Sequence, residues 1–241
     1  MEDAIAVEVR NLKKNYGSFQ ALKDVSFSVR TGEVYGLIGP NGAGKTTTLR
    51  VLATLLRISA GSVRIFGIDV AAHPEETRKV ISYLPEDAGA YKNLTGRLYL
   101  EFIARFFARG DAEHAMVARG LDIVHLEDRI DDKVETYSKG MMRRLLVGRA
   151  LMTEPRLAIL DELTSGLDVI NAQQIRHIVR ERATAGTTFV VSSHNMLEVE
   201  LLCDRIALVH DGIIVEIGTP AELKEKHHAS NIEEVFMAVA G

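Results

Sequence analysis

The sequence has little of what holds small extracellular domains together or anchors a chain in a membrane. Among its 241 residues there is one cysteine, Cys203, and no tryptophan. A lone cysteine cannot form a disulfide within the chain, which favours a reducing compartment. No apolar run approaches the ~20 residues that a helix needs to cross a bilayer. The start, Met1-Glu2-Asp3-Ala4, lacks the basic and then apolar pattern of a signal peptide. Any action at a membrane would therefore need another polypeptide to span it.

A strong excess of charge of one sign is also absent. The net charge of −4 gives no argument for nucleic acid as a main partner. A hydrophobic content of 46% and a charged content of 26% suit a sizeable core and argue against disorder. The sequence shows no internal repeat, low-complexity tract or flexible linker. Its length fits one large domain, or one domain with an inserted subdomain.

The most informative motif is a glycine-rich loop. Residues 39–46 read Gly-Pro-Asn-Gly-Ala-Gly-Lys-Thr and match the phosphate-loop pattern G-x-x-x-x-G-K-S/T. An apolar strand pattern (34–38) precedes the loop and a helical pattern (47–56) follows it. Glycines let consecutive backbone N–H groups point into one concavity, and the helix N-terminus behind them favours a polyanion. Lys45 can reach the β- and γ-phosphates, and the Thr46 hydroxyl can ligate Mg²⁺. We therefore predict a nucleoside triphosphate site rather than a chance glycine-rich turn.

The coarse pattern of elements predicts an α/β fold with a helical insert. Alternation predicts strands at 6–12 and 25–29 with a turn at 15–18, then strands at 62–68 and at 80–84, the last ending before Pro85. From about 95 to 151 the pattern is helical, with one helix at 112–124. A helical face is predicted for Leu98, Leu100, Phe102, Ile103, Phe106 and Phe107. We interpret this stretch as an all-helical insert; its alternative is a continuation of the α/β domain.

The last third returns to alternating strands and helices. Strands are predicted at 157–160, 187–193, 205–209 and 213–217, and helices at 171–185, 220–226 and 231–239. Asp211-Gly212 between the last two strands is a hairpin signal. The strand at 157–160 delivers Asp161 and Glu162 at its carboxyl end, where ligands bind in open α/β sheets. Because alternation sends the two side chains different ways, Asp161 can support the magnesium shell while Glu162 faces the attacking water.

Two further groups are weaker signals when each is taken alone. Ser138 is a plausible N-cap, and with Gly140 in the first turn the helix start could form a second anion site or simply a capped amphipathic helix. His194 follows a strand end, where it could be structural or could donate to a γ-phosphate.

Taken in order, these motifs closely resemble the ATP-binding-cassette family. The order is Tyr16, the phosphate loop, the signature around Ser138, the acidic strand end, Ser165-Gly166-Leu167-Asp168 and then His194. The resemblance covers about 6–218. It implies a P-loop NTPase core with a mixed sheet, an antiparallel β subdomain and a helical insert. The whole chain, 1–241, would be one nucleotide-binding domain with a helical subdomain at about 87–151.

The resemblance also implies a role for each matching residue. Tyr16 would stack on adenine, Thr47 would contact the α-phosphate, and Ser138 with Gly140 would close over ATP bound to a second copy. Asp168 would lie at the dimer seam, Glu162 would polarise water, and His194 would act as the γ-phosphate switch. Thr46, Asp161 and Glu86 would hold Mg²⁺. The phosphates would be cradled by Gly39, Pro40, Asn41, Gly42, Ala43, Gly44, Lys45 and Thr46.

Four positions depart from the family pattern. Glu86 stands where the family usually has Gln, and it brings a metal-binding carboxylate but also a negative charge near phosphate. Lys139 and Met141 replace a Gly and a Gln of the signature, so a positive charge is added and a hydrogen-bond donor is lost. Leu163 stands where Pro is common. These substitutions resemble the branch that exports drugs, ions, lipids or polysaccharides.

The implied function is an ATP-binding and ATP-hydrolysing subunit that powers transport, with export as the expected direction. It would use ATP and Mg²⁺, pair head to tail with a second copy, and bind transmembrane permease subunits at the inner face of the cell membrane. Two alternatives stay open: a soluble ATPase of the same superfamily and a non-hydrolysing ATP-gated switch. A P-loop kinase would not explain Ser138, Gly140 or His194. The transported substrate is not indicated, because the membrane subunits would contact it.

Overall fold

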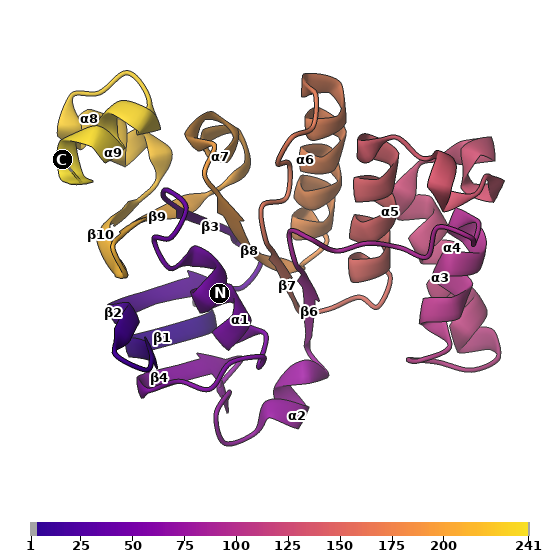
Figure 1. Ribbon diagram of the computed structural model, residues 1–241, viewed down its shortest axis with the longest axis horizontal. Helices are drawn as coiled ribbons and strands as arrows, with labels where there is room; N and C mark the ends of the chain where they lie inside the picture. Colours follow the sequence, from indigo (N-terminus) through magenta and orange to yellow (C-terminus); the bar gives the residue numbers. More distant parts are fainter. Residues whose placement is uncertain (1–3, 241) are drawn as a thin grey trace.

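A single twisted sheet of ten strands organises the part of the chain that the structure describes. A computed structural model describes residues 4–240, so Met1, Glu2 and Asp3, part of the expectation about a signal peptide, lie outside the described residues. The strand order is β5-β4-β1-β2-β10-β9-β3-β8-β7-β6. Helices cover both faces, and the antiparallel strands lie at the end of the sheet away from helices α3 to α5 (Figure 1).

The antiparallel half is a pair of hairpins. It contains β1 (Ile5–Tyr16), β2 (Phe19–Arg30), β4 (Ala60–Ile65) and β5 (Ile68–Asp69). The turn predicted at 15–18 is shorter than expected, because Tyr16 still pairs with Phe19. The single strand predicted at 62–68 was wrong: Phe66 and Gly67 have φ of 49° and 80°, and this left-handed pair turns the chain back on itself.

The other half is mostly parallel and carries the site at its strand ends. It contains β3 (Val34–Ile38), β6 (Ile81–Leu84), β7 (Leu157–Leu160), β8 (Thr188–Ser193), β9 (Arg205–His210) and β10 (Ile213–Gly218). Strands β3, β7 and β8 are buried along their whole length, as expected for parallel strands covered on both faces. The strand expected as buried at 80–84 is instead the half-buried edge strand β6. The predicted hairpin at Asp211-Gly212 is confirmed between β9 and β10.

Most of the predicted helices exist, with shifted ends. Outside the helical segment the structure contains α1 (Lys45–Leu52), α2 (Pro74–Arg78), α6 (Val169–Thr184), α7 (Met196–Leu202), α8 (Pro220–His227) and α9 (Ile232–Ala240). Helix α1 starts inside the phosphate loop and ends four residues before the predicted position 56, because Thr54 has a left-handed φ of 63°. Helices α2 and α7 were not predicted; both are short.

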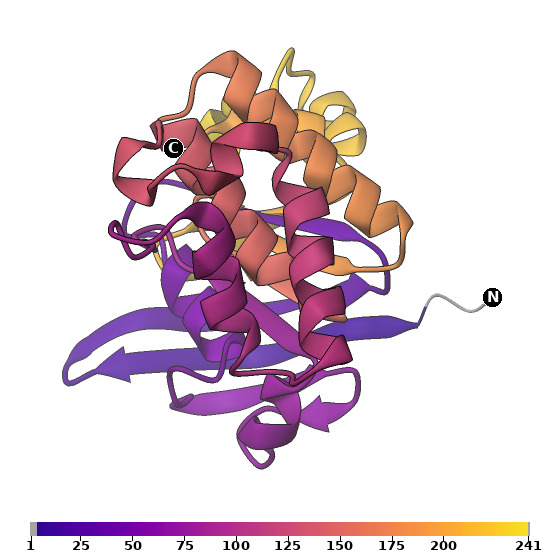
Figure 2. The same ribbon diagram turned by 90° about the vertical axis from the view of Figure 1, so that its right-hand side faces the viewer.

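Between β6 and β7 the described chain forms helices and turns but no strand, as the periodicity predicted. It contains α3 (Gly96–Ala104), α4 (Asp111–Val124) and α5 (Lys139–Leu151), with two short 3₁₀ segments before α5. The Thr95 and Ser138 side chains accept hydrogen bonds from the first-turn N–H groups of α3 and α5, so both helices begin at a capping residue. Figure 2 shows these helices in front of the rest of the molecule.

The predicted apolar face of the first insert helix was wrong in detail. Leu100 is buried, but Leu98, Phe102, Phe106 and Phe107 are exposed at 48%, 37%, 70% and 64%. Phe102 packs edge-on against Phe106 and Tyr91, with ring centroids 5.2 and 5.4 Å apart. Residues 98, 102 and 106 follow the i, i+4 spacing, and all three side chains are exposed. Tyr91, Leu98, Phe102, Phe106 and Phe107 lie on α3 or in the segments that flank it, and we call them together the aromatic surface of α3.

The core lies on both faces of the sheet. One cluster joins Leu49 and Leu52 of α1 to β1 and β2 and to one face of the parallel strands. The other joins Phe189 on the opposite face to α5 and α6. The sheet thus fixes α1, and with it the phosphate loop, relative to the ends of β7 and β8. Within residues 4–240, no helix is both long and apolar enough to span a bilayer.

The second cluster gives a stability prediction. Phe189 is completely buried, so Phe189→Ala should lower the free energy of unfolding by about 3–5 kcal/mol, through lost transfer energy and the cavity that remains. Phe107→Ala removes the same type of side chain from an exposed position and should change the free energy of unfolding by less than about 0.5 kcal/mol. Urea unfolding followed by circular dichroism would measure both. Equal effects of the two substitutions would contradict this placement of the core.

Candidate nucleotide-binding site

The phosphate loop links β3 to α1. Gly44, the last residue before α1, has φ of 108°, a conformation that glycine adopts without strain. Gly39 is required for space, because a Cβ there would overlap the carbonyl oxygen of Val209 in β9. The loop can therefore run close to the sheet while its N–H groups and the start of α1 favour an anion.

Lys45 is held at the centre of this loop. Its side chain is 5% exposed, and its Nζ donates to the carbonyl oxygens of Gly39 (2.7 Å) and Pro40 (3.1 Å). The same nitrogen lies 3.5 Å from Oε1 of Glu162. The loop and the acidic end of β7, far apart in sequence, thus meet at one ammonium group.

Asp161 and Thr46, both predicted to hold Mg²⁺, lie side by side. The Thr46 hydroxyl lies 3.3 Å from Oδ1 of Asp161 and donates to it. The Ser192 hydroxyl donates to the same oxygen at 2.5 Å and accepts from the N–H of Glu162 at 2.9 Å. Ser192, at the end of β8, was missed as a site residue because only pairing of β7 with β8 brings it there.

These oxygens suit Mg²⁺. An octahedral Mg²⁺ has oxygen ligands at about 2.0–2.1 Å, so adjacent ligand oxygens lie roughly 3 Å apart. The 3.3 Å between the Thr46 and Asp161 oxygens is close to that spacing, and the Ser192 hydroxyl orients the carboxylate. Glu86 lies on the same pocket as Thr46. Among the described residues, no group of three or more His, Cys, Asp or Glu side chains could hold a metal, so phosphate or water oxygens would have to complete the shell.

Glu162 lies between Lys45 and His194. Glu162 is 5% exposed, and its backbone has a left-handed φ of 47°, a strained conformation for any residue other than glycine. Oε2 lies 2.7 Å from Nδ1 of His194 and also accepts from the His194 N–H at 3.4 Å. The predicted strand-end histidine therefore contacts the predicted general base directly.

Tyr16 also lies at this pocket. A cavity of about 250 Å³ is lined by Tyr16, Phe19, Ala21, Asn41, Gly42, Gly44, Lys45, Thr46, Thr47, Glu86 and Glu162. Tyr16 is 46% exposed, and the Lys14 ammonium lies 5.0 Å from its ring centroid. Phe19, 64% exposed on the other side of the hairpin turn, was not predicted as a site residue. Its pairing with Tyr16 is the signal that could have found it.

The signature residues do not line that pocket in the same chain. Ser138 is exposed at the start of α5, where its side chain accepts from the Met141 N–H at 3.2 Å. Gly140 packs on Asn171, since a Cβ there would overlap the Asn171 amide. Asp168 caps α6, and the Asn171 backbone N–H, followed by its side-chain amide, lowers the pKa of Asp168. Ser138, Gly140 and Asp168, which were expected where two copies meet, thus lie at the adjacent starts of α5 and α6.

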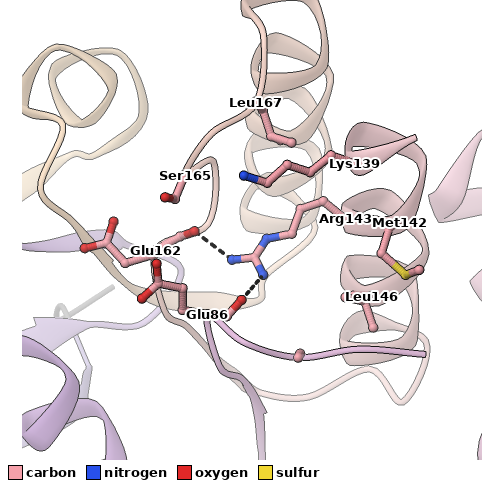
Figure 3. A pocket seen from close by; sticks show the side chains of 9 residues that line it. Glu86, Lys139, Met142, Arg143, Leu146, Glu162, Ser165 and Leu167 are labelled. Atoms are coloured by element: carbon pink, nitrogen blue, oxygen red, sulfur yellow. Dashed lines mark hydrogen bonds between the residues drawn. The ribbon is translucent and has the colours of Figure 1, made fainter. Parts of the chain in front are cut away.

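A second cavity adjoins the first from the signature side. It has a volume of about 200 Å³ and is lined by Glu86, Ala88, Lys139, Met142, Arg143, Leu146, Glu162, Ser165 and Leu167 (Figure 3). Lys139 extends over Gly166 at this cavity, which Glu86 and Glu162 of the same chain also line. Arg143 was not predicted as a site residue. Its position on a helix, five residues after the Ser138 cap, resembles that of many surface arginines.

Comparison with known proteins gives one consistent result. A family model described as ABC transporter matches residues 22–165. The linearmycin resistance ATP-binding protein LnrL of Bacillus subtilis is 36% identical over 90% of this chain and 70% of its own length. The Nod factor export ATP-binding protein I of Burkholderia orbicola is 37% identical over 95% of this chain and 76% of its own length. The daunorubicin/doxorubicin resistance ATP-binding protein DrrA of Streptomyces peucetius is 39% identical over 91% of this chain and 67% of its own length.

Solved structures agree with the fold. The ATP binding subunit of an ABC transporter superposes with a TM-score of 0.85 at 29% identity, covering 97% of this chain and 99% of that chain. A nucleotide-free ATP-binding cassette from an ABC transporter gives a TM-score of 0.80 at 26% identity (96% and 98%). The predicted P-loop NTPase fold with its mixed sheet is thereby confirmed.

The hydrogen bonds of Ser192 can be tested separately from any ligand. Ser192→Ala should lower the free energy of unfolding by about 1–3 kcal/mol, because the buried Asp161 carboxylate and Glu162 N–H both lose a partner. Thr184→Ala, at an exposed hydroxyl that donates to the Arg180 carbonyl, should change it by less than about 0.5 kcal/mol. Chemical denaturation of both variants is the measurement. An unchanged Ser192→Ala protein would mean that this serine does not support the Asp161 carboxylate and the Glu162 backbone.

Proposed function

Because this chain belongs to the ABC transporter family and is an ATP-binding, ATP-hydrolysing subunit of that family, we propose that it powers export across a membrane. Two copies would close head to tail on two ATP molecules, and transmembrane permease subunits would convert the closure into transport. The chain would act as one domain, with 87–151 as its helical subdomain, at the cytoplasmic face of the membrane.

One observation carries the proposal. Lys45 of the phosphate loop, Glu162 at the end of β7 and His194 at the end of β8 form a chain of contacts of 3.5 and 2.7 Å. Asp161 lies beside them, paired with Thr46 and Ser192. A cation for phosphate, two oxygens for Mg²⁺, a carboxylate base and a histidine thus meet where the parallel strands end.

The geometry supports a simple hydrolytic step. Glu162 would accept a proton from the attacking water as the water oxygen forms its bond to the γ-phosphorus and the bond to the bridging β,γ-oxygen breaks. Lys45 would balance the negative charge of the β- and γ-phosphates. His194 would hold the Glu162 carboxylate and contact the γ-phosphate. Thr46 and Asp161 would hold Mg²⁺, which neutralises phosphate charge when bound, with Glu86 beside it.

The second copy would complete the site. Ser138 is exposed at the N-terminus of α5, where helix N–H groups favour an anion, yet it lies outside the pocket of its own phosphate loop. We infer that Ser138 and Gly140 close over ATP bound to the partner copy, and that the exposed Asp168 lies at the seam between copies. Tyr16 would stack on adenine, and Thr47 would contact the α-phosphate.

The aromatic surface of α3 supports a permease partner. Beside it lies a groove of about 520 Å³ lined by Ala53, Arg78, Ile81, Ser82, Tyr83, Ile103, Phe106, Phe107, Arg149, Ala150 and Thr153. A cluster of exposed apolar side chains on one face marks an interaction site more often than a scattered set of exposed apolar residues does. The names of the similar resistance and export proteins favour export as the direction.

The first test addresses Glu162. Glu162→Gln should lower kcat for ATP hydrolysis by about 10²–10⁴-fold, because the amide cannot accept the proton from water. Binding of ATP should persist, and the stalled variant should form an ATP-dependent dimer visible by size-exclusion chromatography with light scattering. Glu233→Gln, on the exposed face of α9, is the matched control. Hydrolysis by Glu162→Gln at the control's rate would place the general base elsewhere.

The second test addresses the membrane partner. The double substitution Phe106→Asp and Phe107→Asp should move the chain from the membrane pellet to the supernatant of its native cells, since charge would be placed in an apolar contact. Met237→Asp adds the same charge at a 67% exposed apolar position on α9 and should leave the distribution unchanged. Unfolding midpoints of the purified variants verify the fold. Recovery of the wild-type chain in the supernatant alone would favour a soluble ATPase instead.

A further inference from the structure

Arg143 makes an unusual set of contacts behind the acidic end of β7. Its Nε donates to the carbonyl oxygen of Leu163 at 2.7 Å, and its Nη2 donates to those of Asp161 (2.8 Å) and Glu162 (2.7 Å). Its Nη1 lies 3.3 and 3.5 Å from the carbonyl oxygens of Glu86 and Pro85. One side chain on α5 thereby contacts five backbone carbonyls in two other segments, and Figure 3 shows the bonds to Glu86 and Glu162.

The arginine is buried, so its charge needs compensation. The residue is 8% exposed, and burial lowers the pKa of Arg143 while the carboxylates of Glu86, Asp161 and Glu162 raise it. Within residues 4–240, no carboxylate forms an ion pair with Arg143 at salt-bridge distance, so the carbonyl oxygens bind its N–H groups instead. A buried cation bound in this way is costly to place, and an apolar residue would fill the space more simply.

The three consecutive carbonyls determine how Glu162 is presented. The carbonyls of Asp161 and Glu162 belong to the two peptide planes that flank the Glu162 Cα atom. Because Nη2 binds both, it restrains φ and ψ of Glu162, whose left-handed φ of 47° is not a relaxed conformation. The direction of the Glu162 carboxylate toward Lys45 and His194 follows from that backbone conformation.

The contacts with residues 85 and 86 add a connection to the loop that follows β6. Arg143 lies in the helix that begins at Ser138, so α5, the Glu86 loop and the end of β7 are joined through one guanidinium. Its planar fork with five donors can make these bonds together, whereas a lysine ammonium is a compact charge on a flexible stem.

We propose that Arg143 is a positioning residue for ATP hydrolysis, which holds the backbone around Glu162 so that its carboxylate faces the attacking water. The inference rests on the proposed role of Glu162 as the general base. Arg143 would act on the rate of hydrolysis and not on ATP binding, since none of its contacts involves the phosphate loop.

The test is a double-mutant cycle in ATP hydrolysis. Arg143→Gln should lower kcat by about 10–100-fold, as a displaced catalytic group does, while the Kd for ATP changes by less than about threefold. In the Glu162→Gln background the same substitution should change the residual single-turnover rate by less than about twofold, because its effect runs through Glu162. Arg144→Gln, the next residue of α5, which binds the His125 carbonyl, is the matched control.

Arg143→Lys separates geometry from charge. We expect it to retain ATP binding and a normal unfolding midpoint but to recover less than about a tenth of the lost rate, because lysine cannot reproduce the fork. Full recovery of kcat by lysine, or an equal loss from Arg143→Gln in both backgrounds, would overturn the proposal. If Glu162→Gln itself hydrolyses ATP at the wild-type rate, the role of Glu162 fails first, and the two results are distinguishable.

Discussion

The burial of two adjacent carboxylates at one strand end is the constraint on which the rest of the site depends. Asp161 and Glu162 are 1% and 5% exposed, and an unpaired buried charge is strongly unfavourable. Each of the neighbouring groups reduces that cost: Ser192 binds Asp161, while Lys45 and His194 bind Glu162. The strands that bring these groups together, β3, β7 and β8, are the most completely buried in the sheet. Packing of an apolar sheet is therefore what makes the polar cluster possible.

Sequence reasoning succeeded where the information is local. The phosphate loop, the acids that follow a buried strand and the histidine after the next strand were all recognisable, because a few neighbouring residues determine each feature. Parallel pairing then brings the ends of β3, β7 and β8 to one edge, which is why these local motifs lie together in one cluster. The same locality explains the well-placed hairpin at Asp211-Gly212 and the capped start of α5 at Ser138.

It failed where a residue's role depends on which segment packs against it. Ser192 and Arg143 bind partners 18 to 58 positions away in sequence, and nothing near either residue indicates those partners. For the first insert helix, periodicity predicted an apolar face but not its direction, and Phe102 and Phe106 turned out to face solvent. An amphipathic pattern cannot distinguish a face buried in the same chain from one left for a partner.

The two charged departures from the family pattern, Glu86 and Lys139, line the same cavity. Glu86 adds a negative charge beside Glu162, and taken alone it would raise the cost of approaching a polyphosphate. Lys139, the departure in the signature, extends into the same cavity, where Arg143 is also buried (Figure 3). The cavity is thus lined by two carboxylates and two cations. Glu86 and Lys139 are both exposed residues on this cavity, so water screens the charge of each. A change at either position should therefore be judged by the charge that it leaves at this cavity, and not by its likeness to the family residue alone.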